Sequence, residues 1–303
     1  MDARITKLRL ANMLSYDWLK IVGAIALAAV FFSLFFTMIG TRVTDGQTFY
    51  VYAYDGLTVG SEFSRLTNKQ ERDKVFTYEI LKTGSESFST SKVYGNTVFT
   101  ARRAAGEGRV MFVNDVRKVD EEGNESSKLL SFIDYEGTPQ ESFGIFLDPE
   151  VFLNDCKDYL AQFFGDDLSG EIDHAKARET FMARNRKDAR FRTAKKREAG
   201  ALLEEERLTK LKDDYLFISS ELGQSLSYVT YTTEVKTHTI GFSMTQLNIT
   251  PIVYYTVEKD GEKVQEKTDI ALCIFNNGAR EGDLKYETVN YIAYLLRAYG
   301  TAK

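Results

Sequence analysis

The sequence has only two cysteines and two histidines among 303 residues. Cys156 and Cys273 each lie in an apolar run, which predicts buried thiols and gives no disulfide framework. Neither cysteine belongs to a Leu-Ala-Gly-Cys lipobox, so a lipid anchor is excluded. His174 and His238 have no nucleophile or metal-ligand pattern around them. We therefore expect no metal and no cofactor.

Motifs for nucleotide binding and for hydrolysis are also missing. There is no Walker A loop, G-x-G-x-x-G, G-x-S-x-G or H-E-x-x-H. Ser89–Lys92 matches S-x-x-K and Lys82–Gly84 matches K-T-G, but their order and spacing differ from those of penicillin-recognising enzymes, so we interpret the match as chance. Carboxylates are plentiful without a pair that has a reason to share a cleft, and we expect no enzyme.

Proline is scarce, with three residues, whereas glycine (21) and aromatic residues (13%) are at ordinary levels, which is typical of an ordered globular protein. The formal net charge is −5. Residues 41–303 alone carry 35 basic and 42 acidic side chains, a net charge of −7. An acidic balance of this kind argues against nucleic acid as a partner.

One long stretch has no charged residue at all. Residues 21–40 read IVGAIALAAVFFSLFFTMIG, and as a helix they would span roughly 30 Å, the thickness of a bilayer's hydrocarbon core. Four basic residues precede this run and only Arg42 follows closely, so the positive-inside tendency places the N-terminus in the cytoplasm. The alternative is a cleaved signal peptide, although the run is long for one and ends in a poor cleavage site.

The sequence thus predicts three parts. Residues 1–20 form a cytoplasmic segment, residues 21–40 a transmembrane helix, and residues 41–303 an extracytoplasmic α/β domain. The expected location is the cell membrane, crossed once, with the C-terminal domain extracellular.

Strands and helices alternate in the first part of this domain. Residues 48–54, 75–81 and 109–114 are rich in β-branched and aromatic residues and predict strands. A short helix is expected within 57–72, a Gly/Ser loop at 83–91, and a helix at 92–106. Strand, helix, strand, helix, strand predicts a parallel sheet.

Helical patterns dominate the middle of the chain. Asp148, Pro149 and Glu150 predict a helix start, and Gly165 its end. Residues 171–218 predict a long charged helical region that Gly200 divides into two helices. Between residues 176 and 197 it holds ten basic and two acidic residues. A solvated hairpin with paired charges and a specific anion site are the two interpretations.

The last part of the chain returns to strands. Residues 228–235, 252–257 and 262–265 predict strands, with a tight turn at Asp260-Gly261. A buried strand is expected at 269–275, and a closing amphipathic helix at 287–299.

Four segments carry a resemblance to a known fold: TFYVYAYDGL, FTYEILK, FTARRAAGEGRVMFVND and DIALCIFNNGAREGDLKYETVNYIAYLLRAYG. The domain resembles a diverged type 2 periplasmic binding protein, the solute-binding fold that serves ABC transporters. The chain is also similar to single-pass membrane proteins of clostridia and relatives that add a basic stretch like residues 181–211. The resemblance implies two lobes with mixed parallel sheets, and a partner ABC permease.

The expected function is a membrane-tethered, solute-binding-like accessory protein. The alternative is a non-catalytic envelope structural or assembly factor that binds protein partners. In open α/β sheets, ligands bind at the carboxyl ends of the strands. This predicts a site for a polar or cationic solute, such as a sugar, at Tyr54, Asp55, Asn114 and Asp115, with Lys82-Thr83 at the end of the second strand. The competing interpretation is that Tyr54 belongs to the core and both aspartates cap turns.

Overall fold

The computed structural model describes Lys7 and residues 18–39, 43–54, 56–88, 95–122, 125–135, 145–232, 237–259 and 262–300. Its helices are α2 (Trp18–Ile39), η1 (Asp45–Gln47), α3 (Ser61–Arg65), α4 (Lys69–Val75), α5 (Gly95–Ala104), α6 (Lys128–Tyr135), α8 (Pro149–Phe164), α9 (His174–Arg184), η3 (Ala189–Phe191), α10 (Ala194–Glu221), η4 (Gly278–Arg280), η5 (Gly282–Tyr286) and α11 (Glu287–Tyr299). Its strands are β1 (Thr48–Tyr54), β2 (Leu57–Val59), β3 (Lys82–Phe88), β4 (Val110–Asn114), β5 (Lys118–Val119), β6 (Glu125–Ser126), β7 (Ser227–Thr232), β8 (Thr237–Ser243), β9 (Val253–Lys259), β10 (Glu262–Glu266) and β11 (Ile270–Ile274).

The main sheet has six strands in the order β3-β1-β4-β11-β8-β7. Strand β1 runs parallel to both β3 and β4, whereas β11, β8 and β7 continue the sheet with antiparallel pairings. The predicted α/β class with a mixed sheet is therefore confirmed. A three-stranded sheet, β10-β9-β2, and the β5–β6 pair lie beside it.

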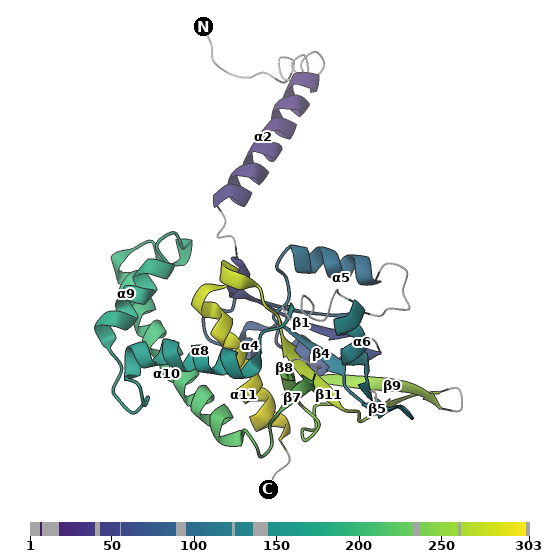
Figure 1. Ribbon diagram of the computed structural model, residues 1–303. Coiled ribbons are helices and arrows are strands. Elements are labelled where there is room, and N and C mark those ends of the chain that lie inside the picture. The colour runs from purple at the N-terminus through teal and green to yellow at the C-terminus, as the bar shows by residue number, and fades with distance from the viewer. Residues whose placement is uncertain are drawn as a thin grey trace.

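Helices cover both faces of the main sheet (Figure 1). Because side chains alternate along a strand, β1 sends Val51 into the core under α8, α10 and α11. Its next residue, Tyr52, enters the core under α5 and α6. The central strands β4 and β11 are buried along their whole length, which explains why the sequence shows continuous apolar runs there.

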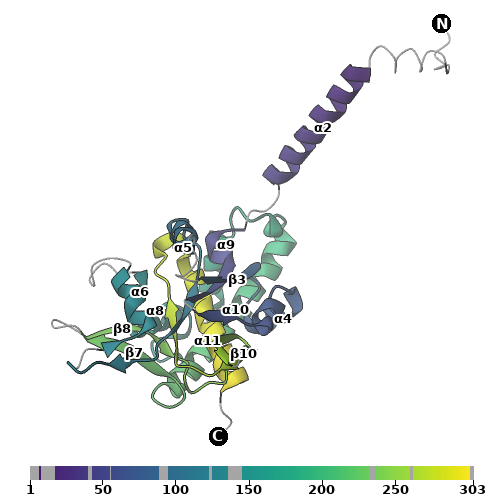
Figure 2. The same ribbon diagram turned by 90° about the vertical axis from the view of Figure 1, so that its right-hand side faces the viewer.

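Helix α2 stands apart from this three-layer domain (Figures 1 and 2). It is the one helix among the described residues that is long and apolar enough to cross a membrane, and none of the span Trp18–Phe35 is buried in the protein. The predicted apolar helix is confirmed. Its direction across a membrane stays a prediction.

The second predicted strand, 75–81, is wrong. That segment follows α4 as a turn, and the strand is β3, seven residues later, where a Gly/Ser loop was expected. The apolar pattern misled because Thr77 and Glu79 turn inward to charged partners. Position 84 of β3 needs a glycine because a Cβ there would collide with the ring of Tyr50 on β1.

The predicted division of the charged helical region at Gly200 is also wrong. Gly200 lies buried inside α10, and the break between helices falls at 185–193. A Cβ on Gly200 would collide with the ring of Phe181 on α9. The glycine allows two helices to approach closely and does not end one.

Some of the other predictions agree with the structure and some do not. Helix α8 begins at the Asp148 cap, whose Oδ1 accepts from the Glu150 N–H at 2.9 Å, and Gly165 ends it. Residues 57–59 form a strand and the helix starts only at Ser61, while β8 was not predicted. The cysteines are free and buried. The Asp260-Gly261 turn lies outside the described residues, and two lobes are not confirmed.

Candidate functional site

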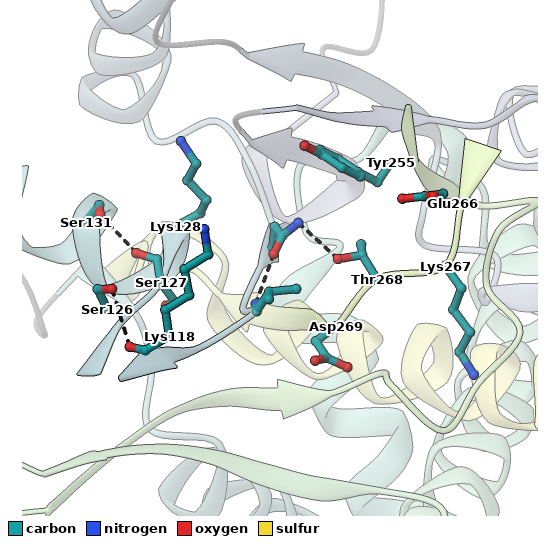
Figure 3. Close-up of a pocket in the computed structure, with 12 residues that line it drawn as sticks. Lys118, Ser126, Ser127, Lys128, Ser131, Tyr255, Glu266, Lys267, Thr268 and Asp269 are labelled. Carbon is teal, nitrogen blue, oxygen red and sulfur yellow. Dashed lines mark hydrogen bonds between the residues drawn. The ribbon is translucent and has the colours of Figure 1, made fainter. Parts of the chain in front are cut away.

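A pocket of about 720 Å³ opens where β4 ends and β11 begins. Its walls come from three places: the main sheet, the β9–β10 hairpin, and the β5–β6–α6 segment (Figure 3). We call it the β4 pocket. It is lined by Asn114, Val116, Lys118, Ser126, Ser127, Lys128, Ser131, Tyr255, Glu266, Lys267, Thr268 and Asp269.

Asn114 is the base of the β4 pocket. It is the last residue of β4 and is 8% exposed. Its Nδ2 donates to Thr268 Oγ1 at 3.0 Å, and its Oδ1 accepts from the Val116 N–H at 2.9 Å. These two hydrogen bonds fix the amide, so its orientation is set before any ligand arrives.

Asp115 supports the wall of the pocket instead of lining it. Its Oδ1 accepts from Ser127 Oγ at 2.8 Å and its Oδ2 from Arg117 Nε at 3.3 Å. Burial raises the pKa of the Asp115 carboxyl, and Asp269 adds to that effect, although Ser127 and Arg117 oppose it. Both oxygens of the Asp115 carboxylate thus already accept hydrogen bonds within the protein.

Ser127 connects this support to helix α6. Its Oγ accepts from the Leu130 N–H at 3.1 Å, which caps the first turn of the helix. The side chains of Lys118 and Lys128 rise beside it on the same side of the pocket, opposite Tyr255 and Glu266 (Figure 3). The site therefore combines ammonium groups, hydroxyls, an amide and the carboxylates of Glu266 and Asp269 around one opening. Because Glu266 is paired with Lys259, the set suits hydroxyl groups and an anionic group beside the lysines.

The four predicted site residues do not come together as one site. Asn114 lines the pocket and Asp115 lies directly behind it. Tyr54 is 3% exposed, and its ring contacts those of Phe99 and Phe132 in the core. Asp55 lies outside the described residues.

Lys82-Thr83 does not lie with them. These residues begin β3, with Lys82 paired to the first residue of β1, so they occupy the opposite end of the sheet from Asn114. The error follows directly from placing the second strand seven residues too early. Thr268 and Tyr255 were missed because β11 pairs antiparallel with β4 and β9 with β2, and no local pattern reveals these pairings. Lys118 and Lys128 come from β5 and α6, which follow β4 in the chain.

A second group of charged residues lies buried on the other side of the domain. We call it the ion cluster, and its members come from the 77–81 turn, α9, η3, α10, η5 and α11. It consists of Glu79, Arg184, Arg190, Glu204, Arg207, Asp283 and Glu287.

Arg207 is the centre of the ion cluster and is 1% exposed. Its Nε donates to Glu287 Oε1 at 2.8 Å and its Nη1 to Glu204 Oε1 at 2.8 Å. Burial opposes the charge, yet the neighbouring carboxylates hold the pKa of the Arg207 guanidinium well above its usual value. The Arg184 guanidinium forms ion pairs with Glu204, Glu79 and Asp283.

The pKa of the Glu79 carboxyl is lowered for the same reason. Burial raises the pKa of Glu79, but Arg184, Arg190 and Asn185 outweigh it and lower that pKa to about 2. Every charge in the cluster has a hydrogen-bonded partner of opposite sign, so the group fastens α9 and α10 to the 77–81 turn and to α11. It is a structural feature that the sequence shows only as scattered charges.

Comparison with protein-family models, with curated proteins and with solved structures finds no match to this chain. The resemblance to solute-binding proteins therefore stays a prediction.

Proposed function

We propose that this chain is a single-pass membrane protein whose α/β domain lies outside the cytoplasm and binds a polar solute in the β4 pocket. The support for the anchor is helix α2, which is long, apolar and unburied. Basic residues precede it, with the interfacial Trp18 at its start. A cleaved signal sequence can have the same length and apolar composition as α2. That α2 stays attached in the mature protein is therefore part of the proposal.

The observation that carries the solute-binding part is the pocket at the carboxyl end of β4. Ligands of open α/β sheets bind at this end of parallel strands, and a volume of about 720 Å³ is within the range of small-molecule sites. Walls from the main sheet and from the β9–β10 hairpin converge on it.

The lining favours a solute with hydroxyl groups and one negative group over a purely cationic solute. No carboxylate pairs with Lys118 or Lys267 among the described residues. Asp115 is engaged by Ser127 and Arg117. Binding, not catalysis, is proposed because the Ser127 hydroxyl is held by Asp115 and by the helix cap.

The proposed partner is an ABC permease, which would receive the solute. The alternative, an envelope structural or assembly factor, is favoured by one observation. The two large cores of the described residues pack on opposite faces of a single sheet, and the remaining core cluster is small and lies in the α9–α10 region. Neither large core forms a separate lobe that could close over the pocket.

A thermal-shift screen of the full chain in detergent tests the binding. Sugars, sugar phosphates and hydroxycarboxylates are added one class at a time, and at least one is expected to raise the melting temperature. Lys118→Gln should reduce that shift, whereas Lys157→Gln, an exposed lysine on α8, should leave it unchanged. No shift with any class, or equal shifts in both variants, would contradict the proposal.

Topology is tested separately. A periplasm-active reporter joined after Gly46 should be active only outside the cytoplasm, and the mature protein should keep residues 1–40 by intact mass. Co-purification with a permease would favour transport. Co-purification with envelope-assembly proteins, without a permease, would favour the alternative.

A further inference from the structure

Five exposed cations gather at the junction of α9 and α10. They are Arg186, Lys187, Arg192, Lys195 and Lys196, and we call them the basic patch. Within the described part of the chain none of them has a carboxylate partner. The acids closest in sequence are already used, because Asp188 pairs with Arg190 and Glu198 with Arg178.

The basic patch lies close to the point where the chain enters the domain. Gln47, at the end of η1, donates from Nε2 to Glu79 Oε2 at 3.3 Å, and Arg190 donates from Nη2 to the same oxygen at 2.6 Å. Arg109 Nη2 also donates to the Gly46 carbonyl at 2.9 Å and fixes η1 to the sheet. The start of the domain and the segment that carries the basic patch thus bind the same carboxylate oxygen of Glu79.

The figures agree with this short connection. Helix α9 lies on the side of the domain from which α2 leaves in both views (Figures 1 and 2). Five residues separate Ile39 from Asp45, so even a fully extended chain spans at most about 22 Å between them. If α2 crosses a membrane, this side of the domain must lie next to the headgroups.

The charge placement is unfavourable within the isolated protein. Lys195 and Lys196 occupy the first turn of α10, a 28-residue helix with no acid in that turn. Cations at a helix N-terminus are repelled by the helix dipole, and an anion placed there relieves this repulsion. The arrangement becomes favourable when an anionic surface lies against it.

We propose that the basic patch docks the domain on the anionic phospholipid headgroups of the membrane that holds α2. This rests on the proposed anchoring. Lysine and arginine near an anionic bilayer are attracted over about one Debye length, roughly 8–10 Å. Docking would fix the domain's orientation, so that the far end of α10 and the C-terminal end of α11 point away from the membrane.

A site-specific probe tests the docking in the full chain. Because both native cysteines are buried, Ala194→Cys beside the patch and Ser220→Cys near the far end of α10 can be labelled selectively with a fluorophore. The two positions are about 39 Å apart along the helix. The protein is reconstituted in vesicles that carry headgroup quenchers, either in neutral phosphatidylcholine or with about a third phosphatidylglycerol.

The label at 194 should be quenched several-fold more in anionic than in neutral vesicles, and high salt should remove the difference. The label at 220 should show no lipid dependence. Lys187→Glu should weaken the effect, and Arg186→Glu combined with Lys187→Glu and Arg192→Glu should abolish it. Lys157→Glu is the matched control, because it changes another exposed lysine, on α8.

Equal quenching of the label at 194 in both lipids would overturn the docking. Flotation of the vesicles after alkaline carbonate shows independently whether α2 holds the chain in the membrane, so a failure of anchoring is distinguished from a failure of docking. Salt-sensitive binding to heparin in detergent, without lipid-dependent quenching, would assign the patch to an acidic polymer and would also overturn the proposal.

Discussion

The ion cluster and the basic patch take arginines from almost the same part of the chain, but these arginines are paired in the ion cluster and exposed in the basic patch. Arg184 and Arg190 turn inward, where carboxylates from the 77–81 turn and from α10 meet them. Arg186 and Arg192, two residues further along in each case, are exposed and have no carboxylate partner in the part of the chain that the structure describes. Composition alone cannot separate the two sets. What separates them is whether a distant carboxylate lies within reach after folding.

Their energetic roles should differ as much as their surroundings. A buried charge that loses its partner is left in a poor solvent, so breaking the ion cluster should be strongly destabilising. An exposed charge without a partner is already solvated, so removing it should matter little for folding. The cluster would then serve stability, and the patch would be available for a partner.

The largest effect is expected from Arg207→Met. It leaves Glu204 and Glu287 buried without their shared partner, which should lower the free energy of unfolding by about 3–5 kcal/mol. Urea unfolding of the detergent-solubilised chain, followed by circular dichroism, measures it. A loss below about 1 kcal/mol would mean that water reaches the cluster and that the contrast with the patch is false.

Acid should weaken the cluster next. The pKa of Glu79 is lowered from 4.5 to about 2, so the folded state binds its proton less tightly than the unfolded state. The stability from this ionisation is present above pH 4.5 and is lost as pH falls toward 2, by up to roughly 3 kcal/mol. Glu79→Gln should be less stable than the wild type at pH 7 and should flatten the pH profile of unfolding in that window. An unchanged profile would contradict the assignment.

A smaller effect is expected where α9 and α10 touch. Gly200→Ala improves helix propensity by up to about 1 kcal/mol, yet the new methyl group collides with Phe181, and overpacking costs about 1–3 kcal/mol. The melting temperature should fall. Ala199→Gly, on the exposed side of the same helix, should also lower it through propensity alone. A rise for Gly200→Ala would show that the helices separate easily.

The smallest effect belongs to the patch itself. Replacing Lys187 and Arg192 by Gln should leave the melting temperature within experimental error, because neither has an ion-pair partner among the described residues. The exposed Arg178–Glu198 pair is the reference for a partnered surface charge. A drop as large as that of Arg207→Met would place these residues in the ion cluster instead of on a free surface.

Local sequence patterns predicted the elements whose own residues form a continuous apolar run or carry a clear helix cap. The strands β1, β4 and β11 and the helices α8 and α11 were expected within a few residues, because continuous apolar runs and caps belong to single segments. The pattern failed at 75–81, where apolar residues surround Thr77 and Glu79. These two side chains face Glu287 and Arg190 from other parts of the chain.

The candidate site was predicted at one residue and missed at most others. Asn114 was expected because it follows a buried strand, and the end of such a strand is readable from sequence. Tyr255 on β9 and Thr268, between β10 and β11, reach the same pocket from more than 130 residues later in the chain. Their position depends on antiparallel pairing with β4 and on the β2–β9 contact.

The sequence by itself determined the apolar helix α2, the α/β alternation of the first domain half, the buried thiols and the net acidic charge, since each depends on the order of neighbouring residues. Only the tertiary structure decided which charges are partnered. Arg207 and Glu287 are 80 residues apart and become neighbours only when α10 packs against α11. Ion pairs and pockets form between segments, and their distances are set by packing that no single segment encodes.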